Sequence, residues 1–396
     1  MIEDSIVVRR SASHLRHLSP ASARIDAEAQ FTVTVQALDE QQLAETRNDP
    51  ATAAVSRPMP LHLIAPVARA PSSATTDSWG LSRVGAGINA AHDGAGVTVA
   101  ILDTGIDRKH DAFRGVELGE DNVVDFTGEG SDDIDGHGTH CAGTIFGRPV
   151  AGVQIGIAPG VTRVLVGKVI GNRESSSKML FSALDWATSG GAQVISMSLG
   201  FDFPGLVQRL VANGWPIELA TSNALSKYRG NLEVFNAIMA KIDALARAGT
   251  AIAGHSGAIV VAATGNESRV DVDPNFRLAA SLPAAANGVC AIGAVKQLGN
   301  GRLGLAGFSN GGAALCAPGV DIVSARAGGG LATMSGTSMA APHVAGLAAL
   351  WCQALSRPGR TNMPKAVADR LMATAQPGVI ENFDGATCGE GLARSP

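Results

Sequence analysis

Four residues whose side chains can together break an acyl bond stand in short motifs along this chain. Asp103 begins Asp-Thr-Gly-Ile-Asp, His137 begins His-Gly-Thr-His, Asn266 ends Thr-Gly-Asn, and Ser338 lies within Gly-Thr-Ser-Met-Ala. A hydroxyl is a weak nucleophile at neutral pH. It needs an imidazole to take its proton, a carboxylate to orient that imidazole, and N–H donors for the oxyanion that forms. The four residues supply one group of each kind, so the sequence predicts acyl-transfer chemistry at a serine.

Each of these residues also has a plainer interpretation. A serine before an apolar helix is often an N-cap, as Ser338 would be, and an Asn after Gly is common in turns. A buried histidine is more often structural than catalytic, and we expect that role for His140. Asp103 and Asp107 as paired acids or metal ligands would leave Ser338 and Asn266 unexplained, so we expect Asp107 to be a loop carboxylate.

Apolar runs that alternate with helical stretches indicate the scaffold for these residues. Such runs are typical of a parallel sheet with helices on both faces, an α/β architecture. The expected strands are residues 97–102, 161–169, 192–197, 258–263 and 289–295, and the expected helices are 177–188 and 338–355. Functional residues in such sheets gather at the carboxyl ends of the strands. Asp103 and Asn266 both follow a predicted strand at this end.

The order Asp, His, Ser and the motifs around these residues resemble those of the subtilisin-like serine protease family. The resemblance runs from about residue 79 to 392. It includes His-Gly-Thr-His-Cys-Ala-Gly at 137–143, Ser-Met-Ser-Leu-Gly at 196–200, and Gly-Thr-Ser-Met-Ala-Ala-Pro-His-Val-Ala-Gly at 336–346. It implies a subtilisin-like three-layer fold with a mostly parallel central sheet over residues 77–396. The implied activity is that of a serine endopeptidase, with Ser338 as nucleophile, His137 as general base and Asp103 as orienting carboxylate.

The same resemblance implies a substrate cleft. Asn266 would be an oxyanion donor beside the Ser338 backbone N–H. One wall would pair as a strand with an extended peptide, so the expected partners are peptides or unfolded protein. The walls are Ser198, Leu199 and Gly200 on one side and Ala263, Thr264 and Gly265 on the other. We expect this pocket, which would hold the side chain of the residue before the cut, to prefer apolar residues broadly. Glu267 lies near the pocket and would admit a basic residue. Phe201 would make the pocket narrower.

Residues 1–76 form a separate N-terminal module and linker. The sequence favours strands at 4–9 and 31–37, a helix at 39–47, an extended segment at 54–64, and a polar linker rich in Pro and Ser after that. Residues 35–50 resemble part of the inhibitory pro-region of subtilases. This implies that the module is an intramolecular inhibitor, self-processed within 66–78, and that the chain is made as a zymogen. The alternative is a plain N-terminal extension packed on the catalytic domain.

An insertion at about 201–256 departs from the compact pattern of the family. Its apolar residues recur at helical spacing: Leu232, Phe235, Ile238, Met239, Ile242 and Leu245. Such a stripe usually packs on a core. Because the insertion leaves from a cleft strand, covering the cleft is the second interpretation.

Charge and cysteine content limit the other partners. A net charge of −4 gives no basic footprint for nucleic acid or an anionic membrane, and we expect neither partner. The first 30 residues contain no apolar run of signal-peptide length, which favours a cytoplasmic location, or a secreted protein trimmed of its signal. Five scattered cysteines without CxxC spacing indicate buried thiols rather than a zinc site or disulfides.

Two further expectations concern metals and reactivity. We expect no cofactor and no metal site; calcium is possible for the family, but the loop at 147–157 is short and Ala112 stands where an acidic ligand often occurs. Cys141, one turn after His137, is expected to be structural. The alternative functions are a non-catalytic protein that binds a partner through the cleft and the insertion, and a peptide-maturing transpeptidase.

Overall fold

The computed structural model describes residues 2–10, 31–67, 78–87, 91–248, 257–299, 301–356 and 363–396. An eight-stranded sheet runs through the larger part of the chain, in the order β12-β11-β10-β8-β5-β7-β6, with β13 also paired to β11. All of its pairs are parallel except β11 with β12. The strands are β5 (Val99–Asp103), β6 (Val123–Asp125), β7 (Val164–Lys168), β8 (Val194–Met197), β10 (Ile259–Ala263), β11 (Val289–Gln297), β12 (Leu303–Leu305) and β13 (Leu315–Pro318).

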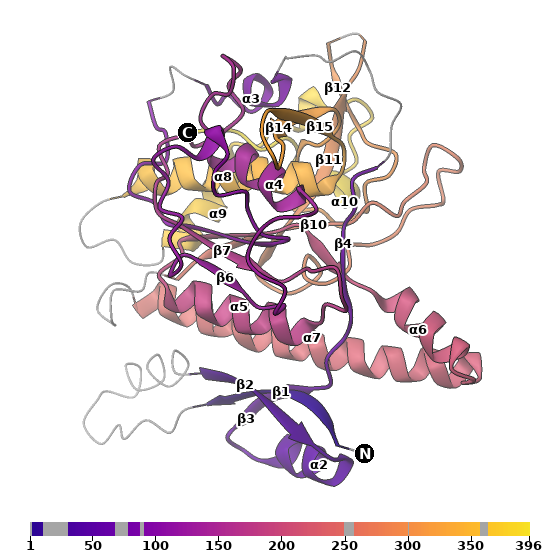
Figure 1. The fold of residues 1–396 in the computed structure, drawn as a ribbon. Coiled ribbons are helices and arrows are strands. Elements are labelled where there is room, and N and C mark those ends of the chain that lie inside the picture. The colour runs from indigo at the N-terminus through magenta and orange to yellow at the C-terminus, as the bar shows by residue number, and fades with distance from the viewer. Residues whose placement is uncertain are drawn as a thin grey trace.

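Helices cover both faces of this sheet, as the apolar strands require. On β5, Val99 and Ile101 join one apolar cluster, while Ala100 and Leu102 join a second on the opposite face. The helices α4 (His137–Phe146), α8 (Thr337–Leu355) and α9 (Met363–Ala373) lie on the first face, and α5 (Ser177–Ser189) and α7 (Ile217–Ala248) on the second (Figure 1). The predicted α/β class with a mostly parallel sheet is confirmed.

Smaller elements complete the chain. A hairpin of β14 (Ile322–Ala325) and β15 (Leu331–Met334) packs on α4. Shorter helices around the large sheet include α3 (Trp79–Val84), α6 (Phe203–Ala212) and α10 (Gly385–Cys388). In the part of the chain that the structure describes, no helix combines the length and apolar character needed to cross a membrane.

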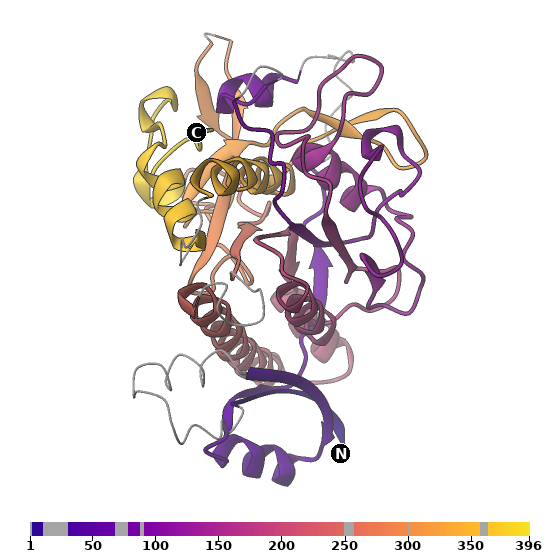
Figure 2. The same cartoon turned by 90° about the vertical axis from the view of Figure 1, so that its left-hand side faces the viewer.

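The N-terminal module is a three-stranded antiparallel sheet in the order β2-β1-β3, with one helix. It contains β1 (Glu3–Arg10), β2 (Phe31–Leu38), α2 (Glu40–Asn48) and β3 (Thr52–Ser56), close to the elements expected from sequence. Val7 faces α2, whereas Ile6 and Val8 belong to the cluster that contains α5 and α7. Figure 2 shows this sheet beneath the two helices, on the side away from the large sheet.

The insertion packs mainly on the N-terminal module and the sheet rather than over the cleft. Val234, Phe235, Ile238 and Ile242 of α7 are buried in the cluster shared with α5 and the module. The end of this insertion, residues 249–256, lies outside the described residues. The first interpretation of the stripe, packing on a core, therefore agrees with the contacts of α7.

Candidate active site

Asp103 and His137 meet at the carboxyl end of β5, where α4 begins. Asp103 Oδ1 lies 2.8 Å from His137 Nδ1, and both side chains are almost fully buried. Burial alone would lower the pKa of His137, but the charge of Asp103 and the hydrogen bond to it outweigh burial and raise that pKa well above its ordinary value. The pair therefore has the geometry of an imidazole held in one tautomer by a carboxylate.

Asp133 joins the end of β5 to the start of α4, and the sequence reasoning did not identify it. This buried carboxylate accepts hydrogen bonds from Thr104 Oγ1 (2.8 Å), Gly136 N (2.8 Å), Thr139 N (2.8 Å) and Thr139 Oγ1 (2.6 Å). Thr104 Oγ1 in turn accepts from Gly138 N at 2.8 Å. Acidic side chains favour helix N-termini, so an Asp four residues before His137 was the available signal. The network fixes the two backbones that carry Asp103 and His137.

Ser338 lies in the first turn of α8, on the opposite side of the site. Its hydroxyl donates to the Ile64 carbonyl at 2.8 Å and lies 3.4 Å from the Ser198 carbonyl. His137 Nε2 is buried and has no hydrogen-bond partner among the described residues. The Ser338 hydroxyl is thus turned toward the N-terminal segment rather than toward the imidazole.

Asn266 follows β10 and faces the same segment. Its Oδ1 accepts from Thr337 N (2.8 Å) and Thr337 Oγ1 (2.9 Å), which turns Nδ2 outward. That Nδ2 donates to the Ala65 carbonyl at 3.0 Å. The structure therefore brings Asp103 together with His137, and Asn266 together with the start of α8, around one stretch of backbone.

This stretch is the end of the N-terminal module, which crosses the cleft as an added strand. β4 (Leu61–Leu63) pairs antiparallel with β9 (Leu199–Phe201), with His62 opposite Gly200. On its other edge, Leu61 N donates to the Ser175 carbonyl at 2.8 Å, and further on Val67 N donates to the Ser335 carbonyl at 2.7 Å. The predicted wall residues Leu199 and Gly200 thus hold a peptide strand.

The other predicted wall residues, Ser198, Ala263, Thr264 and Gly265, lie near the start of α8 and the end of β10. Ser198 Oγ donates to the Ser338 carbonyl at 3.2 Å, and Gly265 N donates to Thr337 Oγ1 at 3.2 Å. Ala263 and Thr264 are buried, and the Ile64 side chain belongs to the same apolar cluster as Ala263. Phe201 does not narrow the pocket as predicted. Its ring packs on Phe181 beneath the sheet, with ring centroids 6.3 Å apart.

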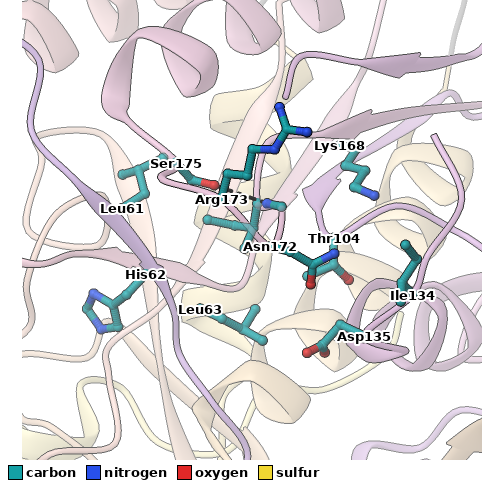
Figure 3. Close-up of a pocket in the computed structure, with 12 residues that line it drawn as sticks. Leu61, His62, Leu63, Thr104, Ile134, Asp135, Lys168, Asn172, Arg173 and Ser175 are labelled. Carbon is teal, nitrogen blue, oxygen red and sulfur yellow. Dashed lines mark hydrogen bonds between the residues drawn. The ribbon is translucent and has the colours of Figure 1, made fainter. Parts of the chain in front are cut away.

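A cavity of about 230 Å³ lies beside β4. Leu61 and Leu63 line it from the strand, and Thr104, Asp135 and Lys168 line it from the opposite side (Figure 3). His62 points to the other side of the strand from Asp135. The cleft therefore continues beyond Ser338, along the N-terminal end of β4.

The cysteines are buried, unpaired thiols, as expected. Cys141 Sγ lies 3.8 Å from His137 Nδ1, and burial raises the pKa of this thiol despite the opposing effect of His137. Among the described residues, Asp103, His137 and Cys141 are the one group with the spacing to hold a metal. Asp103 and His137 are close because they are hydrogen-bonded to each other, so the closeness of these three side chains needs no metal ion to explain it. The expectation that the protein needs no metal stays a prediction.

The family model of subtilases, Peptidase_S8, matches residues 94–389, and this chain belongs to that family. Among its relatives, "Subtilisin-like protease 6" of Trichophyton verrucosum is 34% identical over 287 residues, which cover 69% of this chain and 57% of the relative. "Subtilisin-like protease 1" of Arthroderma benhamiae is 35% identical over 290 residues, 69% of this chain and 58% of the relative. The chain thus spans less than two thirds of the length of these curated relatives.

Two solved structures are similar to this fold. Fervidolysin from Fervidobacterium pennivorans, a keratinolytic enzyme related to subtilisin, superposes with a TM-score of 0.65 at 22% identity, covering 100% of this chain and 60% of that one. A cold adapted subtilisin-like serine proteinase superposes with a TM-score of 0.53 at 28% identity, covering 79% of this chain and 97% of that one. The first comparison supports the fold alone.

Proposed function

We propose that this chain is a serine endopeptidase made as a zymogen. Ser338 attacks the peptide carbonyl, His137 takes its proton, Asp103 orients and stabilises the imidazolium, and Asn266 donates to the oxyanion. The observation that carries the proposal is the occupied cleft: a strand of the chain itself presents two successive carbonyls to Ser338 and Asn266. The buried Asp103–His137 pair beside them supports the same chemistry.

The bound strand acts as an intramolecular inhibitor. Productive attack requires one carbonyl to meet both the nucleophile and the oxyanion donor. Here Ser338 Oγ contacts the carbonyl of Ile64, whereas Asn266 Nδ2 contacts that of Ala65. The strand is therefore one residue out of the position for cleavage, and it fills the cleft without being cut.

Self-processing follows when the strand shifts by one residue. The expected bond is then Ile64–Ala65 or Ala65–Pro66, at or just before the start of the 66–78 segment predicted from sequence. Most of that segment, residues 68–77, lies outside the described residues. N-terminal sequencing of the mature fragment should give a start at Ala65 or Pro66, and Ser338→Ala should stay full length. Processing of Ser338→Ala at the same bond and speed would assign the cut to another protease.

Covalent labelling tests the activity itself. A fluorophosphonate probe should label the processed wild type at Ser338, and labelling should be absent in Ser338→Ala. A processed protein that the probe leaves unlabelled would favour a non-catalytic, peptide-binding role for the cleft. Joined rather than hydrolysed peptides among the products would indicate the transpeptidase alternative.

A further inference from the structure

Glu267 presents a fixed carboxylate at the rim of the cleft. Its Oε2 accepts from Asn310 Nδ2 at 2.6 Å, and Asn310 is itself buried and held by Ser268 N and Ser268 Oγ at 3.0 and 2.9 Å. Gly265, with φ of 114°, permits this approach, because a Cβ there would lie 2.5 Å from the carboxylate. Burial raises the pKa of Glu267, but the nearby His62 imidazole and the hydrogen bond from Asn310 outweigh burial, so the pKa is lowered and the group is an anion.

The group that faces this carboxylate comes from the bound strand. His62 Nε2 lies 3.8 Å from Glu267 Oε1, and His62 is the one ionic partner of Glu267 in the described part of the chain. The imidazole lies over Gly200, where an added Cβ would come within 2.9 Å of the ring and 3.4 Å of Ser281 Oγ. A side chain at this strand position therefore passes across Gly200 toward an anion.

We propose that Glu267, with Gly200 as its floor and Ser281 at its side, forms a subsite for a cationic side chain two residues before the residue whose carbonyl meets Ser338 Oγ. The separation of 3.8 Å is longer than a hydrogen bond, so His62 fills the subsite incompletely. Lysine or arginine has the length to form a charge-assisted hydrogen bond with the free Oε1. The position is distinct from the pocket for the residue before the cut, where the sequence reasoning placed this acid.

The positions next to His62 in the bound strand indicate which other residues a substrate should carry. Leu61 and Ile64 are 7% and 2% exposed, so the positions on either side of the His62–Leu63 pair take apolar side chains. Leu63 lines the cavity beside β4 and packs on the apolar cluster, so the inferred substrate class is a segment of the form apolar, cationic, apolar, apolar, with the cut after the last. This inference rests on the proposed endopeptidase function and adds the identity of its substrates.

Peptide kinetics test the subsite in the processed enzyme. Two peptides that match residues 61–67 and carry Lys or Met at the position of His62 should differ about fivefold in kcat/KM, in favour of Lys, the scale expected for a part-exposed ion pair. Glu267→Gln should bring this ratio close to one, and 1 M salt should reduce it. Glu174→Gln is the matched control. Glu174 precedes Ser175 on the opposite edge of β4, and its loss should leave the ratio unchanged.

A second measurement does not depend on catalysis. In full-length Ser338→Ala at pH 8, the change His62→Lys should raise the denaturant midpoint for release of the N-terminal module relative to His62→Met. Combination with Glu267→Gln should erase that difference.

The outcomes separate the two proposals. Peptides that are cut with equal kcat/KM for Lys and Met, or equal midpoints for the two His62 variants, overturn the subsite. Unequal midpoints with no peptide cut overturn the endopeptidase function and leave the subsite standing.

Discussion

The helix that carries Ser338 and the helix that holds the N-terminal module differ sharply in how they are packed. Every residue of α8 from Thr337 to Cys352 is buried. By contrast, residues 211–219, at the turn into α7, are all exposed, and cavities of about 330 and 360 Å³ lie between this end of α7 and the module. The catalytic half is thus one continuous core, whereas the module rests on a looser interface.

Besides the apolar contacts of Ile6 and Val8, that interface contains a few polar anchors. Asn231 Nδ2 donates to Ser56 Oγ (3.1 Å) and to the Arg57 carbonyl (2.9 Å), and Lys241 Nζ donates to the Phe31 carbonyl (2.9 Å). Polar contacts tie the module to α7 at defined points, while the chemistry depends on residues buried elsewhere. We therefore expect changes in one region to leave the other intact, and the following experiments test this separation.

The largest effect is expected at Asp103. The change Asp103→Asn should lower kcat on a peptide by about 10⁴, because the imidazole loses its tautomer and counter-charge. Steady-state kinetics measures it on variant protein that has been processed in trans by a trace of the wild type. Asp107→Asn is the control: its carboxylate accepts from Lys109 N and Gly328 N, outside the site. A loss of less than tenfold for Asp103→Asn would remove this residue from the catalytic group.

The next effect is expected at Asn266, the proposed oxyanion donor. Asn266→Ala should reduce kcat by roughly 10²–10³ with little change in KM, since the donor acts on charge that develops in the transition state. An equal rise in KM with unchanged kcat would make Asn266 a substrate-binding residue only.

A smaller effect is expected where α7 anchors the module. In full-length Ser338→Ala, Asn231→Ala should speed hydrogen exchange of residues 61–67 by about five- to a hundredfold, because unpaired buried groups cost about 1–3 kcal/mol. Amides of α8 should be unaffected. Asn223→Ala, on the same helix and with no hydrogen bond to β3 among the described residues, should have little effect. Equal acceleration in α8 would show that the two regions unfold as one.

The last expected effect, on stability rather than on activity, comes from pH and should originate in the core that contains His140 and His343. Burial lowers the pKa of His140 to about 3 and that of His343 to about 4. Below pH 6.5 these histidines bind protons in the unfolded chain but stay neutral in the native state. The free energy of unfolding should therefore decrease as the pH is lowered, by at most about 1.4 kcal/mol per pH unit for each histidine. His137, whose pKa is raised in the native state, has the opposite effect: it adds stability as the pH falls toward 6.5 and changes little below that, so it offsets part of the loss only near neutral pH.

Urea unfolding of Ser338→Ala at pH 7 and pH 5.5 would measure this slope. His343→Gln should reduce it by about half. An unchanged free energy of unfolding between the two pH values would show that these histidines are not kept neutral by burial.

The sequence was most informative where burial and chemistry coincide. The apolar run at 97–102 predicted β5 and, with it, the place of Asp103. The two strands, the helix and the extended segment of the N-terminal module also lie close to their predicted bounds. Pairing between distant segments was not visible, because periodicity reports which face is buried and not what covers it. The sequence predicted that the end of the module lies in the cleft, but the pairing of β4 with β9, the role of α7 as a support for the module and the inward packing of Phe201 came only from the structure.

Asp133 was missed for another reason. An Asp just before a helix is usually interpreted as an exposed N-cap. Asp133 is buried because Thr104, which follows β5, contacts it, and this contact joins segments that are distant in sequence. The cytoplasmic location and the absence of membrane, nucleic-acid and metal partners stay predictions from the sequence.

The pairing of β4 with β9 within a single chain has a kinetic consequence. A strand tethered this closely has an effective concentration on the order of millimolar at its own cleft, whatever the concentration of the protein. Under the proposed inhibition, dilution would therefore not activate the intact chain, and a substrate at micromolar concentration would compete poorly with the strand. Once the peptide bond that joins the module to the rest of the chain is cut, the fraction of clefts that hold the strand depends on the dissociation constant and on the concentration of the released module. Cleavage of one bond would thus replace an inhibition that is independent of concentration with an ordinary binding equilibrium.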